Sequence, residues 1–194
     1  MEKHLKRVIN DSVDLKKKLF KLSPQISKAI DLITSTLKKG NKILICGNGG
    51  SAADAQHLAA EFLIRLRPKI NRSPYPVISL AQDTSTITAC GNDLGFDNLF
   101  KRNFEALANK NDLLITLSTS GNSKNIIKVL KCAKIKKIRS ISFLGNKGGK
   151  SKGLSNIEII VPSNNTARIQ ECHIFIGHFI FQSAEDRLIK KINS

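Results

Sequence analysis

The sequence predicts an α/β fold: a doubly wound, five-stranded parallel sheet with an N-terminal helical arm. Short apolar runs alternate with longer segments of helical periodicity, which is the order of a chain built from βαβ units. The runs are continuously apolar, as expected for strands covered on both faces. No run approaches the roughly 20 apolar residues that are needed to cross a membrane.

The elements follow one another with recognisable boundaries. The first predicted helix has Ser23 as its cap, Pro24 in its first turn and Gly40 after its end. It belongs to a predicted arm, 1–40, and the α/β core of the same single domain covers 41–194. The predicted helices are 24–39, 51–66, 84–90, 96–108, 122–137 and 165–190, and the predicted strands are 42–46, 75–80, 112–117, 139–145 and 157–162.

Composition limits the setting and the partners. The N-terminal residues are charged and lack the apolar stretch of a secretory signal, and the four cysteines have no paired spacing, so we expect a cytoplasmic protein with free thiols. The net charge is +17, with one Tyr and no Trp. Because Tyr and Trp, which could stack on bases, are nearly absent, we interpret this charge as compositional bias that also attracts phosphorylated substrates, and we do not expect a nucleic-acid partner.

A glycine-rich turn, GNGGS at 47–51, follows the first predicted strand. Such a turn offers flexible backbone and unpaired N–H groups at the start of a helix, where anionic groups bind. Ser51 is the predicted helix cap, with Asp54 three residues later as in a capping box. The turn lacks the later glycine of a dinucleotide fingerprint and the Lys-Ser/Thr pair of a nucleotide P-loop, so neither class is indicated.

The helix after this turn carries four polar residues on one face. Their directions fall within roughly 80° of one another at about 100° per residue. His57 and Glu61 have the i, i+4 spacing at which two side chains reach one metal ion or one substrate atom. A solvated face with a Glu61–Arg65 ion pair explains the same spacing, so both interpretations stay open. The four residues are Asp54, His57, Glu61 and Arg65.

The third predicted strand ends in LSTSGNSKN, 117–125, which places several hydroxyls at the N-terminus of a helix. Hydroxyls and unpaired N–H groups there suit a phosphate monoester, and the alternative is an ordinary helix cap that uses one hydroxyl. We interpret the segment as a phosphate site because four hydroxyls fall within six residues. They belong to Ser118, Thr119, Ser120 and Ser123.

Further candidates lie in the loop CGNDLGF and on the last helix. Asn92 and Asp93 offer a donor and an acceptor for sugar hydroxyls, although both are also common turn formers. His178 lies in the uncharged segment CHIFIGHFIF, which belongs in a core or an oligomer interface, so it is either a core histidine or part of a site. Gln170 lies about 12 Å before His178 along the helix, and if both serve one site we expect a neighbouring subunit to supply one of them.

Four motifs resemble those of the sugar isomerase (SIS) domain family, and within it the bacterial phosphoheptose isomerases. They are GNGGSAADAQHLAAEF at 47–62, ACGNDLGF at 89–96, STSGNS at 118–123 and ARIQECHIFIGH at 167–178. The resemblance implies a flavodoxin-like SIS fold and interconversion of sedoheptulose 7-phosphate and D-glycero-D-manno-heptose 7-phosphate through an enediol. It also implies a homotetramer with sites at subunit interfaces, and a product used for nucleotide-heptose in cell-surface glycans such as lipopolysaccharide.

The resemblance implies a role for each candidate residue. Glu61 is the implied catalytic base, and His178 is the opposing acid/base. The implied ligands of one zinc ion per subunit are His57, Glu61, Gln170 and His178. The residues implied in substrate binding are Asn48, Gly49, Gly50, Ser51, Glu61, Arg65, Asn92, Asp93, Ser118, Thr119, Ser120, Ser123 and Gln170.

The chain departs from the family pattern in two places. Ala167 stands where some members have Asp, and the segment FLIRLRPKINRSPYP after Glu61 is bulkier and more basic than usual. Rival interpretations are an isomerase of another sugar phosphate and a non-enzymatic SIS scaffold that binds a replication initiator. Scaffold members lack the Glu and His at the positions of Glu61 and His178, and this chain has both.

Overall fold

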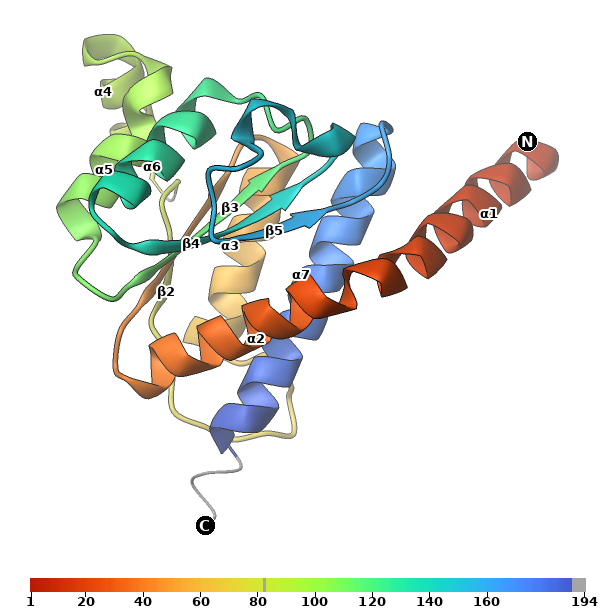
Figure 1. The fold of residues 1–194 in the computed structure, drawn as a ribbon, viewed down its shortest axis with the longest axis horizontal. Helices are drawn as coiled ribbons and strands as arrows, with labels where there is room; N and C mark the ends of the chain where they lie inside the picture. The colour runs from red at the N-terminus through yellow and green to blue at the C-terminus, as the bar shows by residue number, and fades with distance from the viewer. Residues whose placement is uncertain (82, 190–194) are drawn as a thin grey trace.

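The computed structural model describes residues 1–81 and 83–189, and its core is one parallel sheet with helices on both faces (Figure 1). The strand order is β2-β1-β3-β4-β5, and every pairing is parallel. The predicted fold class is therefore confirmed. The strands are β1 Ile43–Gly47, β2 Val77–Ser79, β3 Leu113–Ser118, β4 Arg139–Leu144 and β5 Ile157–Ile160.

The strand order brings two loops together at the carboxyl edge of the sheet. In this order the chain winds in opposite directions from β1 and β3, and ligands bind in the crevice between such strands. The loop after β1 holds the glycine-rich turn, and the loop after β3 holds the hydroxyl segment. The topology thus places both sequence motifs at the expected crevice.

Two helical layers cover the sheet. Helices α2, α3 and α7 pack on one face with Ile43 and Ile45, and helices α5 and α6 pack on the other with Leu44 and Cys46. No helix in the described ranges is both long and apolar enough to cross a membrane. The helices are α1 Glu2–Lys18, η1 Leu19–Leu22, α2 Ser23–Lys38, α3 Gly50–Leu63, α4 Thr84–Asp93, η2 Phe96–Asn98, α5 Leu99–Leu107, α6 Lys124–Ile135, η3 Asn146–Ser151 and α7 Thr166–Ile189.

The N-terminal arm is helical over almost its whole length, and α1 projects from the body of the molecule (Figure 1). The predicted cap at Ser23 is wrong. The turn η1 continues the helical path from α1 into α2, so Ser23 is the first residue of α2 and its hydroxyl donates backwards to the carbonyl of Phe20 at 2.6 Å. A helix that continues from a preceding turn has fewer free N–H groups for a cap to satisfy.

The structure also corrects three boundaries around the site. Helix α3 starts at Gly50 with Gly49 as its cap, so Ser51 lies inside the helix and forms no capping box with Asp54. It ends at Leu63, which leaves Arg65 beyond the helix. Helix α4 runs on to Asp93, three residues further than the sequence predicts.

Candidate active site

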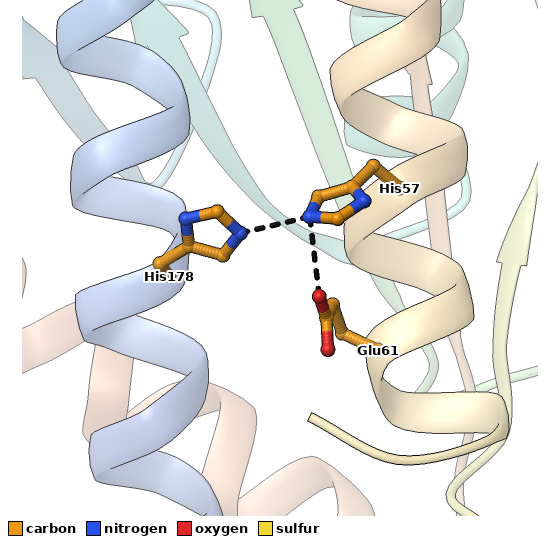
Figure 2. Close-up of side chains that lie close together, drawn as sticks. All are labelled: His57, Glu61 and His178. Atoms are coloured by element: carbon orange, nitrogen blue, oxygen red, sulfur yellow. Dashed lines mark hydrogen bonds and ion pairs between the residues drawn. The ribbon is translucent and has the colours of Figure 1, made fainter. Parts of the chain in front are cut away.

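Three side chains meet between α3 and α7 (Figure 2). Nε2 of His57 lies 2.9 Å from Nε2 of His178 and 3.1 Å from Oε1 of Glu61. The donor atoms of His57, Glu61 and His178 all lie within 4.8 Å of one another. The side chain of Glu61 is 16% exposed and that of His57 is 50% exposed, so the cluster is open to solvent on one side.

The hydrogen bonds of the cluster define its proton arrangement. Two ring nitrogens at 2.9 Å share one proton, because two lone pairs or two N–H groups would repel each other. Because a carboxylate only accepts hydrogen bonds, we assign the shared proton of the metal-free cluster to Nε2 of His57, which then faces both acceptors; a bound metal ion would displace this proton. Nε2 of His178 consequently presents a lone pair to the site.

A close approach of the two helices places the cluster. A Cβ atom on Gly177 would lie 2.7 Å from Cδ1 of Leu58. Gly177 directly precedes His178, and Leu58 directly follows His57. Only a glycine permits this contact without displacement, and the contact brings the two rings within reach of each other.

Asp54 lies one turn before His57 on α3 and is buried. Its Oδ2 has no hydrogen-bond partner within the described ranges. Burial raises the pKa of the Asp54 carboxyl, and the nearby His57 partly offsets that rise. A carboxyl with a raised pKa therefore lies one turn from His57 on the same helix.

The hydroxyl loop after β3 is held rigidly at the start of α6. The hydroxyl of Ser118 accepts from the N–H of Gly121 at 3.1 Å, and that of Ser120 accepts from the N–H of Asn122 at the same distance. A Cβ atom on Gly121 would lie 2.0 Å from the carbonyl oxygen of Gly148, so the loop packs directly on η3. Ser123 occupies the N-cap position of α6 without a side-chain cap hydrogen bond, and its hydroxyl lies 3.5 Å from that of Ser118.

Asn125 links the two crevice loops and was missed by the sequence analysis. Its side-chain amide exchanges two hydrogen bonds of 2.9 Å with that of Asn48. Its Oδ1 also accepts from the N–H of Ile126, and the residue is 2% exposed. The only sequence signal was an asparagine at the end of the segment LSTSGNSKN, which gives no pairing by itself. The link keeps the glycine-rich turn beside the hydroxyl loop.

Other predicted residues lie apart from the cluster. The amide of Gln170 packs against Gly50, about two turns before His57 on α3. Asn92 and Asp93 are exposed in the last turn of α4, where Nδ2 of Asn92 donates to Oδ1 of Asp93 at 2.7 Å. Arg65 is exposed beyond the end of α3. Their roles in substrate or metal binding stay predictions.

Comparisons with known proteins identify the family. The SIS domain model matches residues 9–145. The phosphoheptose isomerase of Aliarcobacter butzleri is 50% identical over 84% of this chain and 85% of its own length, and that of Aquifex aeolicus is 43% identical over 98% and 100%. The chain belongs to the phosphoheptose isomerase family. The solved structure of a phosphoheptose isomerase from Francisella tularensis superposes with a TM-score of 0.90 at 34% identity, covering 95% of this chain and 97% of that one.

The cluster of His57, Glu61 and His178 also has the composition of a metal site. Two imidazole nitrogens and one carboxylate oxygen converge within 4.8 Å, and these are ligand types that zinc prefers. Catalytic zinc sites commonly use three protein ligands and leave one position for water or substrate. The residues present therefore fit a zinc ion.

Proposed function

We propose that the protein is an aldose–ketose isomerase that interconverts sedoheptulose 7-phosphate and D-glycero-D-manno-heptose 7-phosphate. The observation that carries this proposal is the convergence of Glu61 and His178 from different helices on one partly exposed space. Family membership supports the choice of reaction and substrate. The product would enter nucleotide-heptose synthesis for cell-surface glycans, a cytoplasmic role in keeping with four unpaired, buried cysteines.

In the proposed mechanism, Glu61 removes the proton from the carbon next to the carbonyl, and the C–H electron pair becomes the double bond of an enediol. His178 moves a proton between the two oxygens. Glu61 then returns its proton to the neighbouring carbon. Each step is a proton transfer, so the reaction needs no oxidant or reductant. Such general acid–base catalysis typically contributes about 10²–10⁴-fold.

The phosphate end of the substrate is assigned to the hydroxyl loop. Ser118, Thr119, Ser120 and Ser123 lie at the N-terminus of α6, where the helix dipole favours an anion. The hydroxyls of Ser118 and Ser120 accept hydrogen bonds within the loop, so each still has its proton to donate to a phosphoryl oxygen. Anchoring the phosphate fixes the open-chain sugar relative to Glu61.

We assign zinc to His57, Glu61 and His178; the fourth predicted ligand, Gln170, would come from a neighbouring subunit, because in the same chain its amide packs against Gly50. A bound zinc ion supplies Lewis-acid stabilisation of the negative charge that develops on the substrate oxygens. The chain's own residues hold the proton carriers in place around that position. The cluster geometry supports this assignment, because its three donor atoms already converge.

We further propose that the protein is a homotetramer. Large apolar side chains are exposed on the arm and on α7, including Phe20 at 80%, Phe175 at 49% and Phe179 at 54%. They line a cavity of about 600 Å³ between α1, α2 and α7. Exposed apolar surface of this kind is typical of subunit interfaces. Light scattering should therefore give the mass of four chains.

A panel of sugar phosphates tests the proposed function. Purified protein is incubated with ketose phosphates of five, six and seven carbons, with and without a chelator, and the aldose product is measured. We expect turnover of sedoheptulose 7-phosphate, loss of activity with chelator, and recovery with Zn²⁺. Glu61→Gln should lower kcat by about 10³-fold while still binding the substrate. No turnover of the seven-carbon substrate, or faster turnover of a five-carbon one, contradicts the proposal.

A further inference from the structure

Arg72 lies in the basic segment after α3 and is the most enclosed cation of that segment. Its side chain is only 1% exposed. The guanidinium lies over the rings of Tyr75, at 4.8 Å, and of Phe62, at 5.5 Å. Such stacking suits a planar guanidinium and fixes its orientation.

Arg72 binds the end of the helix that carries Glu61. Its Nη2 donates to the main-chain carbonyl of Glu61 at 2.8 Å, and its Nη1 donates to that of Phe62 at 3.0 Å. Carbonyls in the last turn of a helix lack partners within the helix, and a cation there is also favoured by the helix dipole. Arg72 therefore caps α3 at the residue whose side chain enters the site.

The same guanidinium binds the helix that carries His178. Its Nε donates to Oε1 of Glu185 at 2.5 Å, and Glu185 is completely buried on α7. Glu185 follows His178 by seven residues, which places both on the same side of α7 about two turns apart. A planar guanidinium with fixed donors thus spans from the Glu61 carbonyl to the helix that holds His178.

We infer that Arg72 is a positioning residue that sets the spacing between Glu61 and His178. This inference rests on the proposed function, since it assigns a purpose to that spacing. The alternative is that Arg72 only anchors the loop after α3. Arg67 separates the two explanations, because it binds the same carboxylate but makes no side-chain hydrogen bond to α3 within the described residues: its Nε donates to Oε2 of Glu185 at 2.7 Å and its Nη2 to Oδ1 of Asp186 at 2.6 Å.

The test compares Arg72→Lys with Arg67→Met. Both variants remove a guanidinium from Glu185, but only Arg72→Lys removes the two bonds to α3. We expect Arg72→Lys to lower kcat by about 10²-fold with little change in KM, since a displacement of about 1 Å costs that much. Arg67→Met should keep kcat within about threefold, although it lowers the melting temperature. Equal losses of kcat in the two variants, or wild-type kcat in Arg72→Lys, overturn the inference.

A second readout does not depend on activity. The chain has four histidines, so the ring ¹⁵N signals of His57 and His178 can be resolved in the metal-free protein. These signals should shift in Arg72→Lys and stay unchanged in Arg67→Met; the opposite result overturns the inference. If the wild type turns over no sugar phosphate, the proposed function fails, while the ring signals still decide the role of Arg72.

Glu185→Gln is the alternative variant if Arg72→Lys does not fold. It keeps the size of the side chain but removes the charge that holds Arg72. Circular dichroism establishes which variants are folded, and the readouts are taken below each variant's melting temperature. We expect Glu185→Gln to lower kcat and to shift both ring signals, and a folded Glu185→Gln with wild-type values overturns the inference.

Discussion

His173 and His178 lie five residues apart on α7, about 140° apart around its axis, and they face different parts of the molecule. His173 is fully buried, and its Nε2 donates to the carbonyl of Leu144 on β4 at 3.1 Å. His178 is partly exposed and faces His57 across the gap between α7 and α3 (Figure 2). One ring is therefore a packed part of the core, and the other lies in a cluster of polar side chains that is open to solvent on one side.

The two environments also differ in whether the imidazole ring can take up or transfer a proton. Burial lowers the pKa of His173 to about 4, although its bond to the Leu144 carbonyl opposes the shift. Nδ1 of His173 has no hydrogen-bond partner among the described residues, so a second ring proton would find no acceptor. A histidine that stays neutral in the core contributes packing, whereas one beside a carboxylate and a second imidazole can transfer protons.

Replacing each histidine by glutamine should give the largest difference between the two sites. His178→Gln removes a proton carrier and should lower kcat by about 10²–10⁴-fold with a nearly unchanged free energy of unfolding. His173→Gln should keep kcat within about threefold and destabilise the fold. Steady-state kinetics and urea unfolding of both variants measure this. A His173→Gln variant that is folded but as inactive as His178→Gln would remove the distinction.

The pH dependence of stability should isolate His173. Its folded pKa, about 4, lies below the ordinary value of 6.5, so the unfolded chain binds more protons between these values. The contribution of His173 to the free energy of unfolding is thus fully present above pH 6.5. It is lost as the pH falls toward 4, and the total loss is about 3 kcal/mol. Urea unfolding at several pH values, for the wild type and His173→Gln, should show this loss only in the wild type. Parallel curves for the two proteins would contradict it.

Some features of α7 can be predicted from its sequence and others cannot. The apolar segment CHIFIGHFIF predicts a packed helix, but it gives both histidines similar neighbours in the sequence, and only the sheet decides which ring is buried. His57 and Glu61 are four residues apart on one helix, so their proximity could be predicted from the sequence. Likewise, the five strands were predicted because continuous apolar runs are typical of a covered parallel sheet.

Long-range contacts explain what the sequence could not predict. Helix α3 ends before Arg65 because Arg72 and the N–H of Tyr75 bind its last carbonyls, and Arg72 is itself held by Glu185, 113 residues away. The pair formed by Asn48 and Asn125 spans 77 residues. Neither contact leaves a periodic pattern, since each depends on how separate elements pack.

Substituting Gly177 should give the smallest effect, and it tests the His178 side of α7 alone. A Cβ atom there would lie 2.7 Å from Cδ1 of buried Leu58, so Leu58 or α7 must shift, which typically costs about 1–3 kcal/mol. Alanine also favours a helix over glycine by about 1 kcal/mol, which offsets part of that cost.

Gly91→Ala separates the two contributions. Gly91 lies in helix α4, and nothing lies within 4 Å of a Cβ atom added there. Its substitution by alanine therefore raises the helix propensity without a steric clash. We expect Gly91→Ala to raise the free energy of unfolding by up to about 1 kcal/mol and Gly177→Ala to lower it by about 1 kcal/mol. Because a shift there moves His178 away from His57, only Gly177→Ala should also lower kcat, by about tenfold. Equal stability and kcat in the two variants would show that the close contact of α3 and α7 does not control the site.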